Sequence, residues 1–179
     1  MVVVFAAVVG VISLIGLRRR MPGLERNPAA LGEHAVLKVI AKLVVPVILL
    51  FALYVQFHGE YSPGGGVQAG VLFAARIILF GLVFGLDAAR GIIPPSVLNK
   101  LPATGALIYG GVGLVTILLG GNFLDYNQLG TDPVAGQHLG IMLVELGVGV
   151  TVSSVMLLIY FTFAERGRGK VADNGEPDR

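Results

Sequence analysis

Two charged residues stand deep inside long apolar stretches, and their side chains are the best placed in this sequence for ion chemistry. Glu145 lies seven residues into the apolar run 138–163, and Arg76 lies nine residues into the run 67–86. Within a bilayer an ionised side chain costs about 2.5–3.5 kcal/mol on insertion scales, so it needs a partner, water or a function. A carboxylate at such a depth can change its protonation state, which would let Glu145 contribute to a cation or proton path.

Arg76 and Glu145 have comparable depths in their runs, at roughly 13 and 10 Å from the same end. We expect the two side chains to approach each other or to face one polar cavity. The alternative is a static buried ion pair that only fixes helix packing. Lys42 lies six residues into the run 36–57, where it either reaches back to the lipid headgroups or faces a polar path.

The most distinctive short run is Pro63-Gly64-Gly65-Gly66, which stands between two apolar stretches. Proline fixes φ and lacks a backbone donor, whereas glycine permits positive φ and close backbone approach. The run predicts a sharp turn between adjacent antiparallel helices, or irregular backbone that dips inward and lines a cavity. It is not a phosphate loop, because no Gly-Lys-Ser/Thr sequence follows it.

Catalysis and cofactor binding are not indicated by the sequence. It contains no cysteine, and His34, His58 and His138 are too scattered to indicate a metal site. No nucleophile–base constellation occurs either. We therefore expect no enzymatic activity, no cofactor and no metal ion, and nothing points to nucleic-acid binding.

The composition requires most of the chain to lie in a bilayer. Of its 179 residues 55% are hydrophobic and 13% are charged, against about 25% charged in soluble domains. Continuous apolar runs of about 20 residues predict spanning helices rather than a barrel. We expect an all-α integral membrane bundle (residues 1–163) and a charged tail (164–179). Its spans, about five in number, are expected at 2–17, 36–57, 67–86, 103–121 and 138–163.

Lys and Arg are distributed unevenly among the connections between these runs. They cluster in 18–38, in 87–102 and in the tail, whereas 58–66 and 122–137 contain none. Positively charged loops stay in the cytoplasm. We therefore expect the N-terminus outside and the C-terminus in the cytoplasm, which requires an odd number of spans.

A family resemblance is carried by residues 53–85, LYVQFHGEYSPGGGVQAGVLFAARIILFGLVFG. The segment resembles the MnhB/MrpB subunit family of Mrp-type multisubunit Na+/H+ antiporters, in which a helix is followed by PGGGF and a helix rich in small residues. Val67 stands here where phenylalanine is typical. Lys42 in IAKLVVPVILL and Asp87 resemble a lysine and an acidic residue of the family. Glu145 in VELGVGV stands where the family commonly has aspartate.

The resemblance covers about residues 37–160 and implies a function. Mrp antiporters exchange cytoplasmic Na+ for external H+ across the prokaryotic cell membrane. They assemble from several hydrophobic subunits, which would be the partners of this chain. Arg76 is not part of the family pattern, so its role rests only on its place inside an apolar run. The ion-pathway candidates that the resemblance implies are Glu145, Lys42, Pro63, Gly64, Gly65, Gly66 and Asp87.

Two alternatives stay open at this point. The chain could be a homologous ion-translocating subunit of a membrane-bound hydrogenase or respiratory complex, which its neighbouring subunits would reveal. It could also be a structural subunit that only supports assembly. In that case Glu145→Gln would leave transport intact, and a helix-packing change such as Gly81→Leu would block assembly.

Overall fold

The computed structural model describes residues 31–59 and 64–173, with side chains placed for 36–59 and 64–165. Within these ranges every regular element is helical. The expected first span and Pro63 lie outside the described residues. In chain order the elements are α2 (Leu31–Phe57), α3 (Gly66–Phe84), α4 (Leu86–Ile92), α5 (Pro95–Leu98), α6 (Leu101–Leu118), the 3-10 helix η1 (Tyr126–Leu129) and α7 (Pro133–Asp173).

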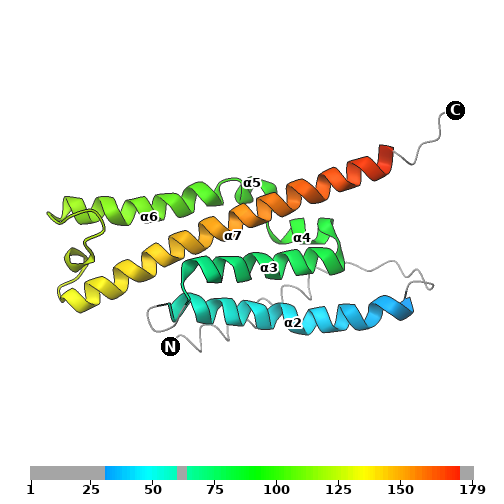
Figure 1. Cartoon of the computed structure of the whole chain (residues 1–179), viewed down its shortest axis with the longest axis horizontal. Coiled ribbons are helices and arrows are strands. Elements are labelled where there is room, and N and C mark those ends of the chain that lie inside the picture. The colour runs from blue at the N-terminus through cyan, green and yellow to red at the C-terminus, as the bar shows by residue number, and fades with distance from the viewer. Residues whose placement is uncertain (1–30, 60–63, 174–179) are drawn as a thin grey trace.

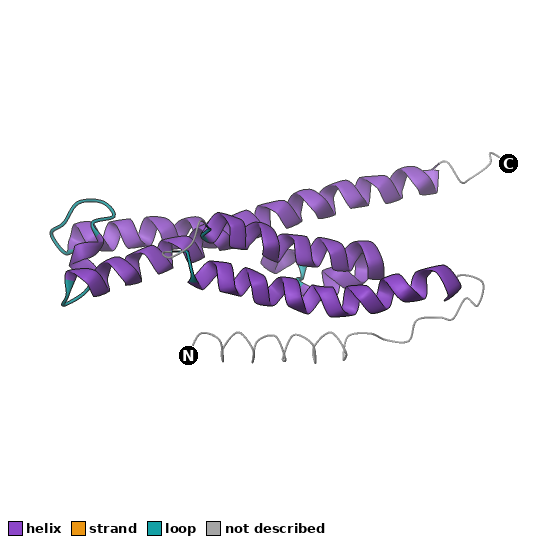
Figure 2. Cartoon of the chain, turned by 60° about the horizontal axis from the view of Figure 1, so that its bottom comes forward, coloured by secondary structure: helices purple, strands orange, loops and turns teal. Residues whose placement is uncertain are grey.

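Four helical segments in the described part are long and apolar enough to cross a bilayer. Their helices run alternately up and down in one elongated bundle (Figure 1), and a second view shows the same arrangement (Figure 2). Between 22% and 33% of each apolar window is buried inside the chain, which leaves most of the apolar surface for lipid or other subunits. This confirms the predicted all-α membrane fold. The segments are Val36–Phe57, Gly66–Phe84, Pro95–Leu118 and Pro133–Glu165.

Glycines let two neighbouring helices approach α7 closely. A Cβ added to Gly105 of α6 would come 2.5 Å from the carbonyl oxygen of Gly147. A Cβ added to Gly70 of α3 would come 2.7 Å from the carbonyl oxygen of Gly149. Small residues at the contact are a usual means of close packing between membrane helices. α6 therefore packs against α7 at Gly147, and α3 packs against α7 at Gly149.

The helices α3 and α7 run in the same direction with a constant register. At the start of α3, Gly66 lies against the backbone of Glu145. Near its end, Gly81 lies against the side chain of Tyr160. In both pairs the number of the α7 residue exceeds that of the α3 residue by 79. Adding 79 to the number of an α3 residue therefore gives the α7 residue that lies at the same height in the bundle.

The connection between α3 and α6 folds into two short helices, whereas the sequence predicted only a connection between apolar runs at 87–102. α3 ends at Phe84, and the next residue, Gly85, has a φ of 99°, in the left-handed region that favours glycine. α4 then packs beside the end of α3. Leu86 and Ala89 of α4 and Leu98 of α5 are buried with Leu157 in the main apolar core. The apolar residues of the connection therefore join a core that sequence periodicity does not reveal.

The last helix extends beyond both ends of the span predicted at 138–163. It begins at Pro133 and continues to Asp173. Proline is tolerated in the first turn of a helix, where its missing donor has no partner to lose. The next proline in the sequence is Pro177, so no helix breaker of that kind interrupts residues 164–173. That part of the expected tail is a continuation of α7.

An ion pair joins α4 to α7. Arg90 contacts Glu165, and the two side chains are 31% and 54% exposed. Because exposed pairs typically contribute about 0.2–1 kcal/mol, we expect Arg90→Gln and Glu165→Gln each to lower the thermal stability of the purified complex slightly. A double-mutant cycle of melting curves measures the coupling. Strictly additive losses would contradict a stabilising pair.

Candidate functional site

The carboxylate of Glu145 lies against the backbone of the turn between α2 and α3. Its oxygens occupy the space where a Cβ on Gly59 or Gly65 would stand; at Gly65 that Cβ would be 2.6 Å from Oε1. A Cβ on Gly66 would overlap the backbone carbonyl of Glu145. The absence of side chains at Gly59, Gly65 and Gly66 lets the backbone at these positions approach the acid closely.

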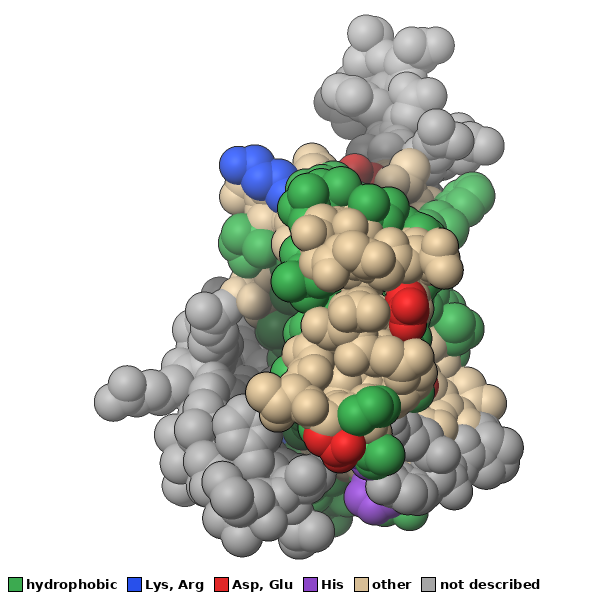
Figure 3. Space-filling model, turned by 90° about the vertical axis from the view of Figure 1, so that its left-hand side faces the viewer, with side chains coloured by type: hydrophobic (Ala, Val, Ile, Leu, Met, Phe, Trp, Pro, Cys, Tyr) green, Lys and Arg blue, Asp and Glu red, His purple; other side chains and the backbone are tan. Residues whose placement is uncertain are grey.

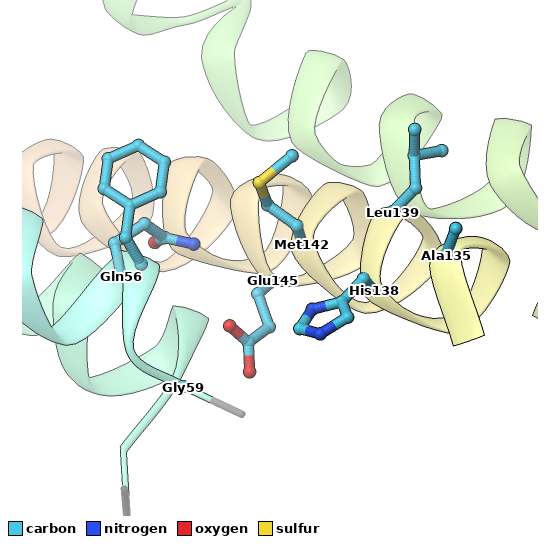
Figure 4. A pocket seen from close by; sticks show the side chains of 8 residues that line it. Gln56, Gly59, Ala135, His138, Leu139, Met142 and Glu145 are labelled. Carbon is cyan, nitrogen blue, oxygen red and sulfur yellow. The ribbon is translucent and has the colours of Figure 1, made fainter. Parts of the chain in front are cut away.

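A cavity of about 470 Å³ opens beside this carboxylate, and we call it the Glu145 cavity. Figure 4 shows Glu145 and His138 projecting into the same space from α7, with Gly59 beyond the carboxylate. The two residues are seven positions apart, which is about two helical turns, so they share one face of the helix. The lining residues are Gln56, Phe57, Gly59, Ala135, His138, Leu139, Met142 and Glu145.

A second hollow, of about 410 Å³, also contains this carboxylate in its lining. Glu145 and Gly59 line both spaces, so the acid stands where the two meet. An ion could therefore reach Glu145 from either hollow. The residues that line the second hollow are Gly59, Gly64, Gly65, Gly66, Val67, Gln68, Val144, Glu145 and Val148.

The charge distribution favours cations at the end of the bundle that holds Glu145. Lys and Arg are absent from residues 43–75 and 101–165. Asp125 and Asp132 lie in the connection between α6 and α7. Figure 3 looks onto this end, where acidic and histidine side chains are visible together with a basic side chain at the upper left. Negative groups with few basic neighbours raise the local concentration of cations.

Arg76 lies at a different level of the bundle from Glu145. It stands ten residues beyond Gly66 on α3, so its backbone is roughly 15 Å along the axis from the level of Glu145. The carboxylate points the other way, toward Gly59 and Gly65. Arg76 lines a separate cavity, to which Glu145 does not contribute. The register therefore argues against a direct Arg76–Glu145 ion pair.

Asp87 and Lys42 lie further still from Glu145. Asp87 is exposed in the first turn of α4, beyond the far end of α3, where an acidic side chain suits the helix dipole. Lys42 is exposed on α2, fourteen residues before Gln56, which is roughly 21 Å along the helix. The roles of both in an ion path stay predictions. The predicted residues that the structure brings together at the site are Glu145, Gly64, Gly65 and Gly66.

Two further residues of the site were not predicted from the sequence. The three histidines are scattered along the chain, yet the spacing of seven between His138 and Glu145 places both on one face of a helix. Gln56 is 4% exposed near the end of α2 and lines the Glu145 cavity. An amide at the end of an apolar run was the available signal for it.

The fold and the site define a multi-pass membrane protein with a carboxylate beside the glycines that connect two of its helices. Residues 36–158 match the family described as a domain related to the MnhB subunit of Na+/H+ antiporter. A Staphylococcus haemolyticus protein named "Putative antiporter subunit mnhB2" is 34% identical over 130 residues, covering 71% of this chain and 92% of that protein. A Staphylococcus aureus protein of the same name is 32% identical over 135 residues, covering 74% and 95%. The chain belongs to the MnhB family of Na+/H+ antiporter subunits.

Membership of this family confirms the resemblance carried by residues 53–85. The matched region contains the glycine turn and Glu145, and it leaves residues 1–35 outside. The family match therefore covers the part of the chain in which the site lies.

Proposed function

We propose that this chain acts in Na+/H+ exchange across the prokaryotic cell membrane and that Glu145 is its ion-binding group. The observation that carries the proposal is the place of the Glu145 carboxylate, which lies within a spanning helix, against a glycine turn and between two hollows. An ionisable group inside a bilayer is costly and marks an ion or proton path by default. Close packing of α3 on α7 comes from glycine backbone, so it does not require the acid.

The chemistry of exchange follows from one carboxylate with two competing partners. A carboxylate oxygen binds a hard cation such as Na+ when it is ionised and gives up that ligand role when it is protonated. Water and backbone oxygens of the turn would supply the remaining ligands. His138 projects into the same cavity, and an imidazole ring has two nitrogens that can donate or accept a hydrogen bond. Glu145 would therefore bind Na+ and H+ alternately, with His138 as a neighbouring proton carrier.

The membrane orientation that suits this role puts the Glu145 end outside. The basic residues of 87–102 and 164–179 belong to the opposite end, which is the cytoplasmic one by the positive-inside rule. Residues 1–163 then form the transmembrane domain, and residues 164–179 form a cytoplasmic segment that starts within α7. The role is transport, with no catalytic step.

The partners in this proposal are other hydrophobic subunits of the same antiporter. Large apolar side chains are exposed along α2 and α6, among them Leu43, Val47, Leu107 and Leu118. Lipid or a helix of another subunit can cover such surface in a bilayer. Lys42, exposed among them on α2, would lie at the lipid headgroups or beside a partner.

Purification from native membranes in a mild detergent tests the assignment. We expect a tagged chain to co-purify with several many-spanning antiporter subunits, and vesicles from cells lacking other antiporters to exchange Na+ for H+ only when the whole set is expressed. Co-purifying hydrogenase or iron–sulfur proteins would instead support the respiratory alternative. A chain recovered alone would overturn the proposal.

A further inference from the structure

A third cavity lies deeper in the bundle, and we call it the inner chamber. It is lined mainly by α2, α3 and α7, with Ile92, Ile93 and Leu101 from α4 to the start of α6. Its volume is about 330 Å³, and its polar lining comes from Gln56, Arg76, Ser153 and Ser154. We propose that the inner chamber holds water and that Gln56 joins it to the Glu145 cavity, so that the two form one hydrated path. This inference deepens the proposed function and rests on Glu145 being an ion-binding group.

Gln56 carries the inference because it is buried, polar and common to both cavities. It is 4% exposed and lines the Glu145 cavity as well as the inner chamber. In the described part of the chain its Nε2 donates a hydrogen bond to no protein group. A buried donor left without an acceptor is expensive, and ordered water is the usual partner of such groups.

The position of this amide is fixed by a second glycine contact. A Cβ on Gly149 would come 2.7 Å from Oε1 of Gln56. Because Gly149 has no side chain, α2 can place the amide against the backbone of α7, between the two cavities. A leucine at position 56 would fill similar space but would offer water no hydrogen bond.

Four of the fifteen residues that line the inner chamber are polar, and these suit water rather than a metal cation. The single hydroxyl proton of Ser154 is shared between the carbonyl oxygens of Val150, at 2.7 Å, and Thr151, at 2.9 Å. The hydroxyl of Ser153 donates to the carbonyl oxygen of Val150 at 3.1 Å. Both hydroxyl oxygens keep lone pairs that accept from water. Among the described residues that line this space there is no carboxylate, so they offer no anionic ligand for Na+. The volume has room for roughly ten waters at liquid density.

If this proposal holds, Na+ and protons use different sides of Gln56. Sodium would approach Glu145 from the two hollows at its own end of the bundle, and it would go no deeper. Protons could pass between Glu145 and the interior along hydrogen-bonded water. Gln56 and the two serines would then belong to the proton side of the exchange.

A thiol placed in the inner chamber tests its hydration. The chain has no cysteine, so Ser153→Cys adds one nearly isosteric thiol to this subunit, within an assembled complex whose other subunits are cysteine-free. A hydrophilic trimethylammonium-ethyl methanethiosulfonate reacts with thiolate, which forms only where water is present. We expect Ser153→Cys to be modified by this reagent. Val155→Cys, on the exposed apolar surface of the same helix, should stay unmodified and is the matched control.

The role of Gln56 is tested in the same background. Adding Gln56→Leu to Ser153→Cys should slow modification about tenfold, as expected for the loss of one hydrogen bond to water. Gln56→Glu, which keeps the shape and the polarity, should leave the rate at least as high as in the parent. Equal modification rates in Ser153→Cys, Ser153→Cys/Gln56→Leu and Ser153→Cys/Gln56→Glu would show that Gln56 is not part of the hydrated path.

Failure of this inference is distinguishable from failure of the proposed function. If only a lipophilic maleimide modifies Ser153→Cys, the chamber is dry and the inference is wrong, whatever Glu145 does. Labelling does not require transport. A labelled chamber in a complex whose exchange does not depend on Glu145 would therefore leave the hydrated path standing and overturn the ion-binding role of the acid.

Discussion

Replacing Glu145 by glutamine should eliminate Na+-dependent proton movement while the complex still assembles. Glutamine has the shape of glutamate, so the contacts with Gly59 and Gly65 can persist, but a neutral amide neither exchanges a proton nor supplies an anionic ligand for Na+. The expected loss is about 100-fold or more, within the usual range for removing a proton-transfer group. The measurement is the quenching and recovery of a pH-sensitive dye in everted vesicles when Na+ is added.

Two further substitutions make this result specific to the carboxylate. Glu145→Asp keeps the charge and shortens the side chain by one methylene, so we expect it to retain a substantial part of the exchange. Glu165→Gln removes another carboxylate from the same helix, far from both hollows, and should leave exchange unchanged. Wild-type exchange by Glu145→Gln in a correctly assembled complex would reduce the chain to a structural subunit.

The second large effect is expected from adding one methyl group at the start of α3. In Gly66→Ala the new Cβ would overlap the backbone carbonyl of Glu145, and backbone cannot rotate away as the tip of a side chain can. The two helices would have to separate. We expect a cost of about 1–3 kcal/mol, as for overpacking elsewhere, and a clear fall in the amount of intact complex on a native gel.

Gly110→Ala is the matched control for this prediction. Gly110 lies within α6, and a Cβ there would meet nothing within 4 Å. Alanine favours a helix over glycine by up to about 1 kcal/mol, so this variant should be as stable as the parent or slightly more so. If alanine lowers stability at position 66 and leaves or raises it at position 110, the loss at position 66 comes from the contact with α7 and not from helix propensity. Equal losses in both variants would contradict the packing argument.

The membrane helices were predictable from the sequence because each one appears as an apolar run within a single segment. An apolar run long enough to span the bilayer appears in the sequence whatever surrounds it, and the described bounds of α2, Leu31–Phe57, contain the run 36–57. The connection that became α4 and α5 was not predictable in this way. Its leucines and alanines were too few for a periodic pattern, and their burial depends on a core built by other helices.

Which site residues lie together depends on the register between helices. The sequence of one segment does not contain that information. Arg76 and Glu145 seemed level because both were counted from the start of an apolar run. The helix of Glu145 begins five residues earlier than its run, at Pro133, and Gly66 fixes its level against α3. Similar depths in the two apolar runs therefore did not mean similar heights in the bundle. Glu145 and the glycine turn could be named as candidates, but their contact required the packed structure.

The length of α7 has a mechanical consequence for the complex. Its 41 residues extend about 60 Å, roughly twice the thickness of the hydrocarbon layer. A continuous hydrogen-bonded helix resists bending over that distance better than a chain interrupted by loops. If α7 tilts at the level of Glu145, the whole helix would tilt with it. The end of α7 at Asp173, beyond the hydrocarbon, would then be displaced as the end of a lever arm is.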